Sequence, residues 1–71
     1  MSWEKSVFSS NVATVGYDDE IQEMVVTFKN GRVYAYEGVD EGTALNVANA
    51  PSVGAALNQQ VKGQYQHRQI R

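Results

Sequence analysis

The alternation of hydrophobic and polar positions predicts three β-strands in the first part of the chain. Residues 11–17 are rich in β-branched side chains and precede an acidic run at 18–20, which predicts a strand followed by a polar turn. Two further apolar runs, at 21–29 and 32–36, flank the dipeptide Asn30-Gly31. Asn-Gly favours a tight hairpin because both residues tolerate a positive φ. The pattern therefore predicts a three-stranded antiparallel meander.

A two-residue loop at Asn30-Gly31 also predicts how the hairpin strands pair and which side chains share a face. The expected core face carries Met24, Val26, Phe28, Val33 and Ala35, and the opposite face carries Val25, Thr27, Tyr34 and Tyr36. Because this second face carries two tyrosines, we expect either the N-terminal arm or a partner to cover it.

Two short helices are predicted where the β pattern stops. Asp40 is a favourable N-cap for a helix over about residues 41–49, and Pro51 ends that helix because proline cannot continue the hydrogen-bond ladder. Ser52 caps a second helix with one apolar stripe, and Gly63 is expected to end it as a C-terminal cap. The order of elements predicts a small single α+β domain, a three-stranded antiparallel β-meander followed by two short α-helices packed on one face.

Length and composition restrict the chain to one small domain. Its 71 residues leave no room for a second core. We divide it into an N-terminal arm at residues 1–9, a domain at 10–65 and a C-terminal tail at 66–71. No run approaches the roughly 20 apolar residues that span a membrane, and no signal peptide is evident. We therefore expect no membrane partner and a cytoplasmic location, which the lack of cysteine also suits.

Few residues could support catalysis or metal binding. The chain has no cysteine and one histidine, His67, which lies in the tail where a catalytic base would be poorly held. The acidic run at 18–20 lacks the spacing of a calcium-binding loop and is interpreted as a solvated turn. We expect a protein that is not an enzyme and needs no metal and no cofactor.

Two tyrosines and a group of basic residues are the candidate binding groups. Tyr34 and Tyr36 are two apart on a strand, the spacing by which some sheets stack unpaired bases. The favoured interpretation is that both pack beneath Trp3, Phe8 or a helix, since a small domain needs its aromatic residues inside. A net charge of −2 argues against a wholly basic surface for nucleic acid. A local basic patch stays open, and its candidates are Lys29, Arg32, Lys62, Arg68 and Arg71.

Gly54 occupies the first turn of the second predicted helix, where glycine lowers helix stability. One explanation is an anion site at the helix start, built from free backbone N–H groups and the Ser52 hydroxyl. The favoured explanation is close packing of the helix on a neighbouring element, with Asn58 satisfying a buried backbone group. We expect Gly54→Val to destabilise the fold before it affects any binding.

An ordered set of short motifs runs through most of the chain, at Ser10, Asn11, Gly16, Tyr17, Phe28, Gly31, Tyr34, Tyr36, Ser52, Gly54, Asn58 and Tyr65. Over about residues 9–65 this set resembles the KTSC family, a domain named for the C-terminus of some lysyl-tRNA synthetases and also found as small free-standing bacterial and phage proteins. The chain departs from the family pattern at Asp40, where a proline is expected, and at Leu57, where an aromatic residue is common. The resemblance implies a compact α+β module with a role in binding RNA, and it brings no catalytic residues.

The residues and the resemblance together favour a non-enzymatic binding module for RNA or another nucleic acid. Its expected contacts are Tyr34, Tyr36, Lys29, Arg32, Lys62 and Arg68. The alternative is a protein-interaction module or a phage or prophage accessory protein, whose aromatic sheet face or N-terminal arm engages a protein partner or forms a homodimer. A weaker third hypothesis is a binder of small anions at the start of the second helix.

Overall fold

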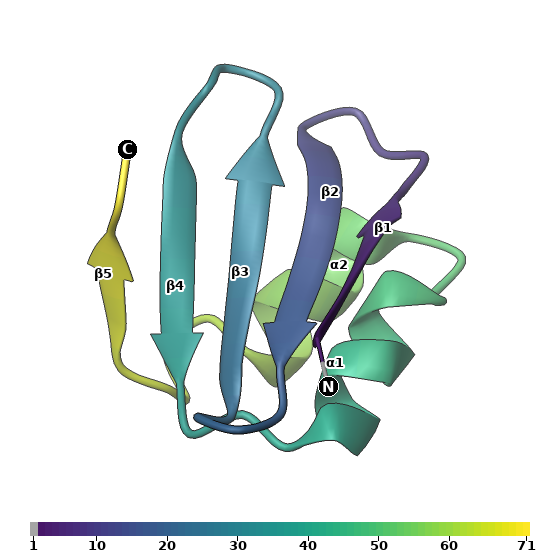
Figure 1. Cartoon of the computed structure of the whole chain (residues 1–71). Coiled ribbons are helices and arrows are strands. Elements are labelled where there is room, and N and C mark those ends of the chain that lie inside the picture. Colours follow the sequence, from purple (N-terminus) through teal and green to yellow (C-terminus); the bar gives the residue numbers. More distant parts are fainter. Residues whose placement is uncertain (1) are drawn as a thin grey trace.

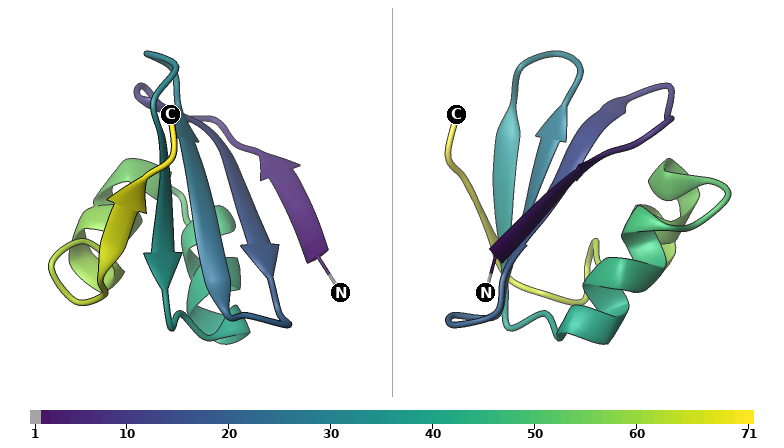
Figure 2. Two further views of the ribbon diagram at one scale, coloured as in Figure 1. Left: turned by 60° about the vertical axis from the view of Figure 1, so that its left-hand side comes forward. Right: turned by 45° about the vertical axis from the view of Figure 1, so that its right-hand side comes forward.

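Five antiparallel strands form one sheet in sequence order, and two helices cover one of its faces (Figures 1 and 2). The computed structural model describes residues 2–71. The elements are β1 (Ser2–Ser6), β2 (Val12–Asp18), β3 (Glu23–Phe28), β4 (Val33–Glu37), α1 (Glu41–Ala48), α2 (Val53–Gln60) and β5 (His67–Gln69). The α+β class is confirmed, and so is the pair of helices on one face. The prediction of a three-stranded sheet is wrong, since the sheet has five strands.

The two additional strands come from the segments expected to be an arm and a tail. In the arm, β1 pairs with β2 so that Trp3 lies opposite Tyr17, whereas Met1 lies outside the described residues. In the tail, β5 pairs with β4 so that His67 lies opposite Tyr36. Both strands are short and lie at the sheet edges (Figure 1). The strands β1 and β5 form by backbone hydrogen bonding to a neighbouring strand. Segments of three to five residues are too short for the alternation of apolar and polar side chains to predict that pairing.

The hairpin between β3 and β4 has a three-residue loop instead of the predicted two-residue loop. The Phe28 N–H donates to the Arg32 carbonyl at 2.8 Å, and the Gly31 N–H donates to the Phe28 carbonyl at 3.0 Å. Gly31 has a φ of 92°, which glycine adopts without strain. A three-residue loop that ends in a left-handed glycine is the next most common hairpin connection after the two-residue turn.

The extra loop residue shifts the pairing by one position, so the predicted faces of β4 were wrong. Val26 lies opposite Tyr34, and Met24 lies opposite Tyr36. Because successive side chains in a strand point to opposite faces, the two tyrosines turn toward the helices. Val33 and Ala35, which were predicted to face the core, lie on the sheet face that carries no helix. The two tyrosines therefore lie on the sheet face that the helices cover, and not on the opposite face as predicted. The favoured interpretation, that the tyrosines pack inside, is confirmed for Tyr36.

Both predicted helix caps are present. The Asp40 carboxylate accepts from the Thr43 N–H at 3.2 Å and from the Thr43 hydroxyl at 2.7 Å. The hydrogen bonds to Thr43 lower the pKa of Asp40 below its ordinary value of 3.8. At the second helix, the Ser52 hydroxyl accepts from the Ala55 N–H at 3.4 Å. The C-cap of α2 is Val61, not Gly63, which has a φ of 81° in the turn that follows.

The core lies between the helices and the sheet face that they cover. It is built mainly from aliphatic side chains of β2, β3, α1 and α2, together with Tyr17 and Tyr36. The Tyr17 side chain is 3% exposed, and its hydroxyl donates to the Val39 carbonyl at 2.7 Å. Burial first, and the carboxylates of Glu41 and Asp40 next, raise the pKa of Tyr17 above its ordinary value of 10.0. The hydrogen bond between Tyr17 and Val39 thus joins β2 to the segment that enters α1.

Candidate functional site

An open pocket of about 540 Å³ lies where the β3–β4 hairpin, the start of β2 and the end of α2 meet. We call it the basic pocket. Its lining residues are Ser10, Asn11, Phe28, Lys29, Asn30, Arg32, Tyr34 and Lys62. Four of the six residues predicted to bind a partner are therefore gathered at one place: three from the β3–β4 hairpin, and Lys62 from a segment far away in the sequence.

Backbone and ring contacts position the basic residues around the pocket. The Lys29 N–H donates to the Asn11 carbonyl at 2.8 Å, which joins the hairpin tip to the start of β2. Lys62 follows α2, and its Nζ lies 5.4 Å from the centre of the Phe28 ring, within cation–π range. Arg32 is held on the opposite side of the loop, where its N–H donates to the Asn30 side-chain oxygen at 3.0 Å. The walls of the open pocket are thus held together by contacts between the hairpin, the start of β2 and the end of α2.

Three cations of the basic pocket have no acidic partner among the residues that the structure describes. The side chains of Lys29, Arg32 and Lys62 are exposed, and within residues 2–71 none of them forms an ion pair. Unpaired cations beside one another repel, and an anion that enters the pocket relieves this repulsion. The arrangement therefore favours a ligand that carries more than one negative charge.

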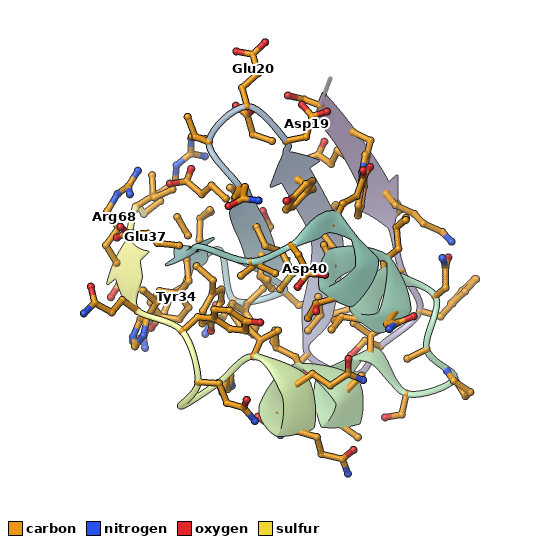
Figure 3. The ribbon with its side chains drawn as sticks, turned by 90° about the horizontal axis from the view of Figure 1, so that it is seen from below. Asp19, Glu20, Tyr34, Glu37, Asp40 and Arg68 are labelled. Carbon is orange, nitrogen blue, oxygen red and sulfur yellow. The ribbon has the colours of Figure 1, made fainter. Side chains whose placement is uncertain are left out.

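The structure places the fourth predicted cation, Arg68, away from the basic pocket. Its guanidinium lies 3.0 Å from a carboxylate oxygen of Glu23 and 3.9 Å from one of Glu37. Figure 3 shows Arg68 beside Glu37, with Tyr34 nearer the helices. Since Ala35 pairs with Arg68, this ion-pair cluster lies on the sheet face that carries no helix. Arg68 is therefore neutralised on a different surface.

The two predicted tyrosines occupy different environments. The rings of Tyr34 and Phe28 meet edge to face, with centres 5.5 Å apart and planes at 71°. Tyr34 is half-buried and lines the basic pocket. Tyr36 is 2% exposed, and burial followed by the neighbouring Tyr34 raises its pKa. Only Tyr34 of the pair can meet a ligand, whereas Tyr36 belongs to the core.

Acidic residues gather at the end of the sheet opposite the hairpin tip, which explains how a chain of charge −2 carries a basic pocket. They occupy the β2–β3 turn, the neighbouring strand ends and the start of α1, and Figure 3 is viewed from this side. We call this the acidic end, made of Asp18, Asp19, Glu20, Glu23, Glu37, Asp40 and Glu41. Every acidic residue except Glu4 belongs to it. The net charge therefore conceals a polarised molecule.

A second pocket, of about 490 Å³, lies at the start of α2 beside the β1–β2 connection. Ser9, which the sequence did not single out, organises it: its hydroxyl accepts from the Asn11 and Val12 N–H groups at 3.3 and 3.2 Å and donates to the Asn11 side-chain oxygen. A Cβ at Gly54 would lie 3.1 Å from that oxygen. Gly54 thus lets the β1–β2 connection approach the helix closely, as the packing explanation predicts.

The remaining motif residues have mainly structural surroundings. Asn58 lines the second pocket, but it is exposed and its side chain forms no hydrogen bond within residues 2–71, so the prediction that it satisfies a buried group is wrong. Ser52 caps α2, and Gly16 lies within β2 between Glu4 and Val25. Tyr65 packs against the core.

The signals for several pocket residues were absent or indirect in the sequence. Ser10 and Asn11 line both pockets, and Phe28 supports Lys62 through its ring. Their motif positions were noted, but no local pattern showed that they would meet the end of α2. Phe8 is fully exposed beside the second pocket, which contradicts the alternative in which it covers the tyrosines.

Two further properties follow from the described part of the chain. Neither helix within residues 2–71 is long and apolar enough to cross a membrane. In the same residues, no three histidine, aspartate or glutamate side chains gather in a way that could hold a metal ion.

Comparisons with known proteins agree with the fold and the motif order. An uncharacterized protein of Stutzerimonas stutzeri (strain A1501) is 37% identical over 57 residues, which are 80% of each chain. The crystal structure of a KTSC domain protein from Yersinia pestis, YPO2434, superposes with a TM-score of 0.89 at 29% identity and covers all of both chains. The sequence model of the KTSC domain matches residues 8–65. With most of its length matched in this way, the chain belongs to the KTSC domain family.

Proposed function

We propose that this chain is a non-enzymatic module that binds RNA or another nucleic acid in the basic pocket. The observation that carries this proposal is the convergence around the half-buried Tyr34 of three cations that form no ion pair in the described part of the chain, Lys29, Arg32 and Lys62. Cations that contact phosphates and an aromatic ring that contacts a base are the two components of most RNA-binding surfaces.

The polarised charge distribution supports the same proposal. A nucleic acid would be repelled by the acidic end and attracted to the opposite side of the molecule, so the field would orient the chain during encounter. The three cations would then contact phosphates, while the exposed part of Tyr34 and the neighbouring Phe28 would contact a base. The Asn11 side-chain amide nitrogen, which has no partner within residues 2–71, could donate to a base edge.

The direct test is an NMR titration with a single-stranded RNA at low salt. We expect amide shifts at Lys29, Arg32 and the residues around Lys62, with an affinity that falls as salt rises. The double variant Lys29→Gln/Lys62→Gln should weaken binding strongly. Lys5→Gln is compared with each single variant, Lys29→Gln or Lys62→Gln, as a control of equal charge change, because Lys5 contacts Asn49 outside the basic pocket. Absence of shifts at low salt, or equal weakening by the control, would contradict the proposal.

A second candidate is a protein-interaction module, favoured by the fully exposed Phe8 in the N-terminal arm. A large aromatic side chain that is fully exposed is typical of an interface residue. This hypothesis predicts either a homodimer or a complex that is lost in Phe8→Ser while the fold stays intact. Light scattering over a wide concentration range tests the homodimer, and a monomer mass throughout, for both proteins, would remove it.

A further inference from the structure

We infer that the basic pocket takes a short single-stranded segment, with one base in the pocket and its flanking phosphates on the three cations, and does not take a duplex. This inference rests on the proposed function and specifies its ligand. It follows from the number of cations, the amount of accessible aromatic surface, the size of the pocket and the way the hairpin is held.

The supply of cations limits the number of phosphates. Lys29, Arg32 and Lys62 line the pocket. Arg71, whose backbone pairs with Val33, lies outside the pocket lining, and Arg68 is occupied by Glu23 and Glu37 on another surface. A protein that follows a duplex neutralises about 6–10 phosphates, well beyond what these three side chains provide. The acidic end would repel a longer polyanion that continued across the sheet. The charge pattern therefore favours a footprint of about three phosphates.

The aromatic surface limits the number of bases. Tyr36 is buried, so it presents no ring face to a ligand. The Tyr34 ring contacts the rings of Phe28 and His67 edge to face, with ring centres 5.5 and 5.7 Å away. Tyr34 is half-buried and is the one tyrosine within residues 2–71 that lines the pocket. There is room to contact one unpaired base, and bases within a duplex are already stacked and do not offer a ring face.

The size of the pocket also agrees with a ligand that places one base in it. A volume of about 540 Å³ falls within the range of sites that hold one small molecule. One nucleotide is a ligand of that class, whereas a duplex, as wide as the protein itself, would only touch the rim. The principal dimensions of the chain are 29 × 25 × 23 Å.

The hairpin is not free to enter a DNA groove. A two-stranded ribbon can read a major groove only if it protrudes. Here β3 and β4 are interior strands flanked by β2 and β5, and the Lys29 N–H is bonded to the Asn11 carbonyl. The tip is therefore held beside the start of β2, and its cations line a pocket instead of projecting from an arm.

The test compares single strands of increasing length with a duplex, using fluorescein-labelled oligouridylates from about two to about sixteen nucleotides and an RNA duplex of the longest length. We expect affinity to rise steeply up to about four nucleotides and afterwards only in proportion to the number of positions available on the strand. The duplex should bind at least about tenfold more weakly than the single strand of equal length. The slope of log affinity against log salt should be about −2, from three contacts at about −0.7 each.

The aromatic contribution is tested with Tyr34→Leu, for which we expect a loss of about tenfold for single strands, and with Tyr34→Phe, which should retain binding. A thermal melt of each variant shows that the fold is intact, and if Tyr34→Leu does not fold, the comparison of strand lengths and duplex still decides the matter. Equal affinity for the duplex, or a salt slope steeper than about −4, would overturn the inference while leaving the proposed function standing. No binding of any oligonucleotide at low salt would refute the proposed function, and the inference with it.

Discussion

Removal of one buried hydroxyl, in Tyr17→Phe, should destabilise the fold measurably. The Tyr17 hydroxyl donates to the Val39 carbonyl at 2.7 Å, and both residues lie in the core. The substitution leaves the rest of the ring in place beside Trp3, whose ring centre is 5.9 Å away. What changes is a single hydrogen bond between β2 and the segment that leads into α1.

The expected magnitude is about 1–3 kcal/mol of unfolding free energy, because the variant leaves a buried carbonyl without a partner. For a domain of this size that loss lowers the melting temperature by about 4–8 °C per kcal/mol. Urea unfolding followed by far-ultraviolet circular dichroism is the appropriate assay, since Trp3 fluorescence would respond to the neighbouring ring itself. Tyr65→Phe is the matched control: its hydroxyl has no partner within residues 2–71, so we expect a change within about 0.5 kcal/mol.

The difference in unfolding free energy between the natural chain and Tyr17→Phe should depend on pH. The pKa of Tyr17 is raised above 10.0 in the folded state, so its phenol stays protonated there after the unfolded chain has begun to ionise. The stability that Tyr17 contributes is therefore complete below about pH 10 and is lost as pH rises through the folded pKa. The advantage of the natural chain over Tyr17→Phe should shrink in that range. A difference below about 0.5 kcal/mol at neutral pH, or one that grew in alkali, would refute this reasoning.

Two other predictions concern the helix starts. Gly54→Val should destabilise the fold by about 1–3 kcal/mol by overpacking against Asn11, whereas Gly54→Ala should be nearly neutral because improved helix propensity offsets the smaller displacement, as urea midpoints would show. Ser52→Ala should cost about 1 kcal/mol through loss of a cap, and Asp40→Ala should lower the urea midpoint for the same reason. Because the pKa of Asp40 is lowered in the folded state, its contribution is present above about pH 3.8 and is lost as pH falls through the folded pKa. The loss of stability in Asp40→Ala should therefore shrink in acid, while the loss in Ser52→Ala should not. If the two losses changed in parallel with pH, the role of the ionised Asp40 carboxylate as a helix cap would be contradicted.

The basic pocket was only partly predictable. Lys29 and Arg32 are close in sequence, so a hairpin signal was enough to place them together. Lys62 joins them only because α2 ends above the Phe28 ring, which depends on the packing of the helix layer against the sheet. Arg68 was grouped with these cations by sequence proximity to Lys62, and the pairing of β5 with β4 separated it from them.

The faces of β4 show why local patterns were insufficient. Two-residue and three-residue loops both accept Asn30-Gly31, and they differ in pairing by one position. Which of the two pairings forms depends on which set of alternate β4 side chains gains more free energy when it is buried. Turning Tyr34 and Tyr36 toward the helices covers far more apolar surface than turning Val33 and Ala35 would, and this difference accounts for the observed pairing.

The sequence by itself determined the position of the hairpin turn, three of the strands, both helices and their caps at Asp40 and Ser52. These features depend on backbone conformation and on hydrogen bonds between residues a few positions apart, so local residue types are sufficient. Only the tertiary structure decided the pairing of β3 with β4, the recruitment of both chain ends as edge strands and the meeting of Lys62 with the hairpin. Those depend on burial and strand pairing between distant segments, whose free energy no short stretch of sequence contains.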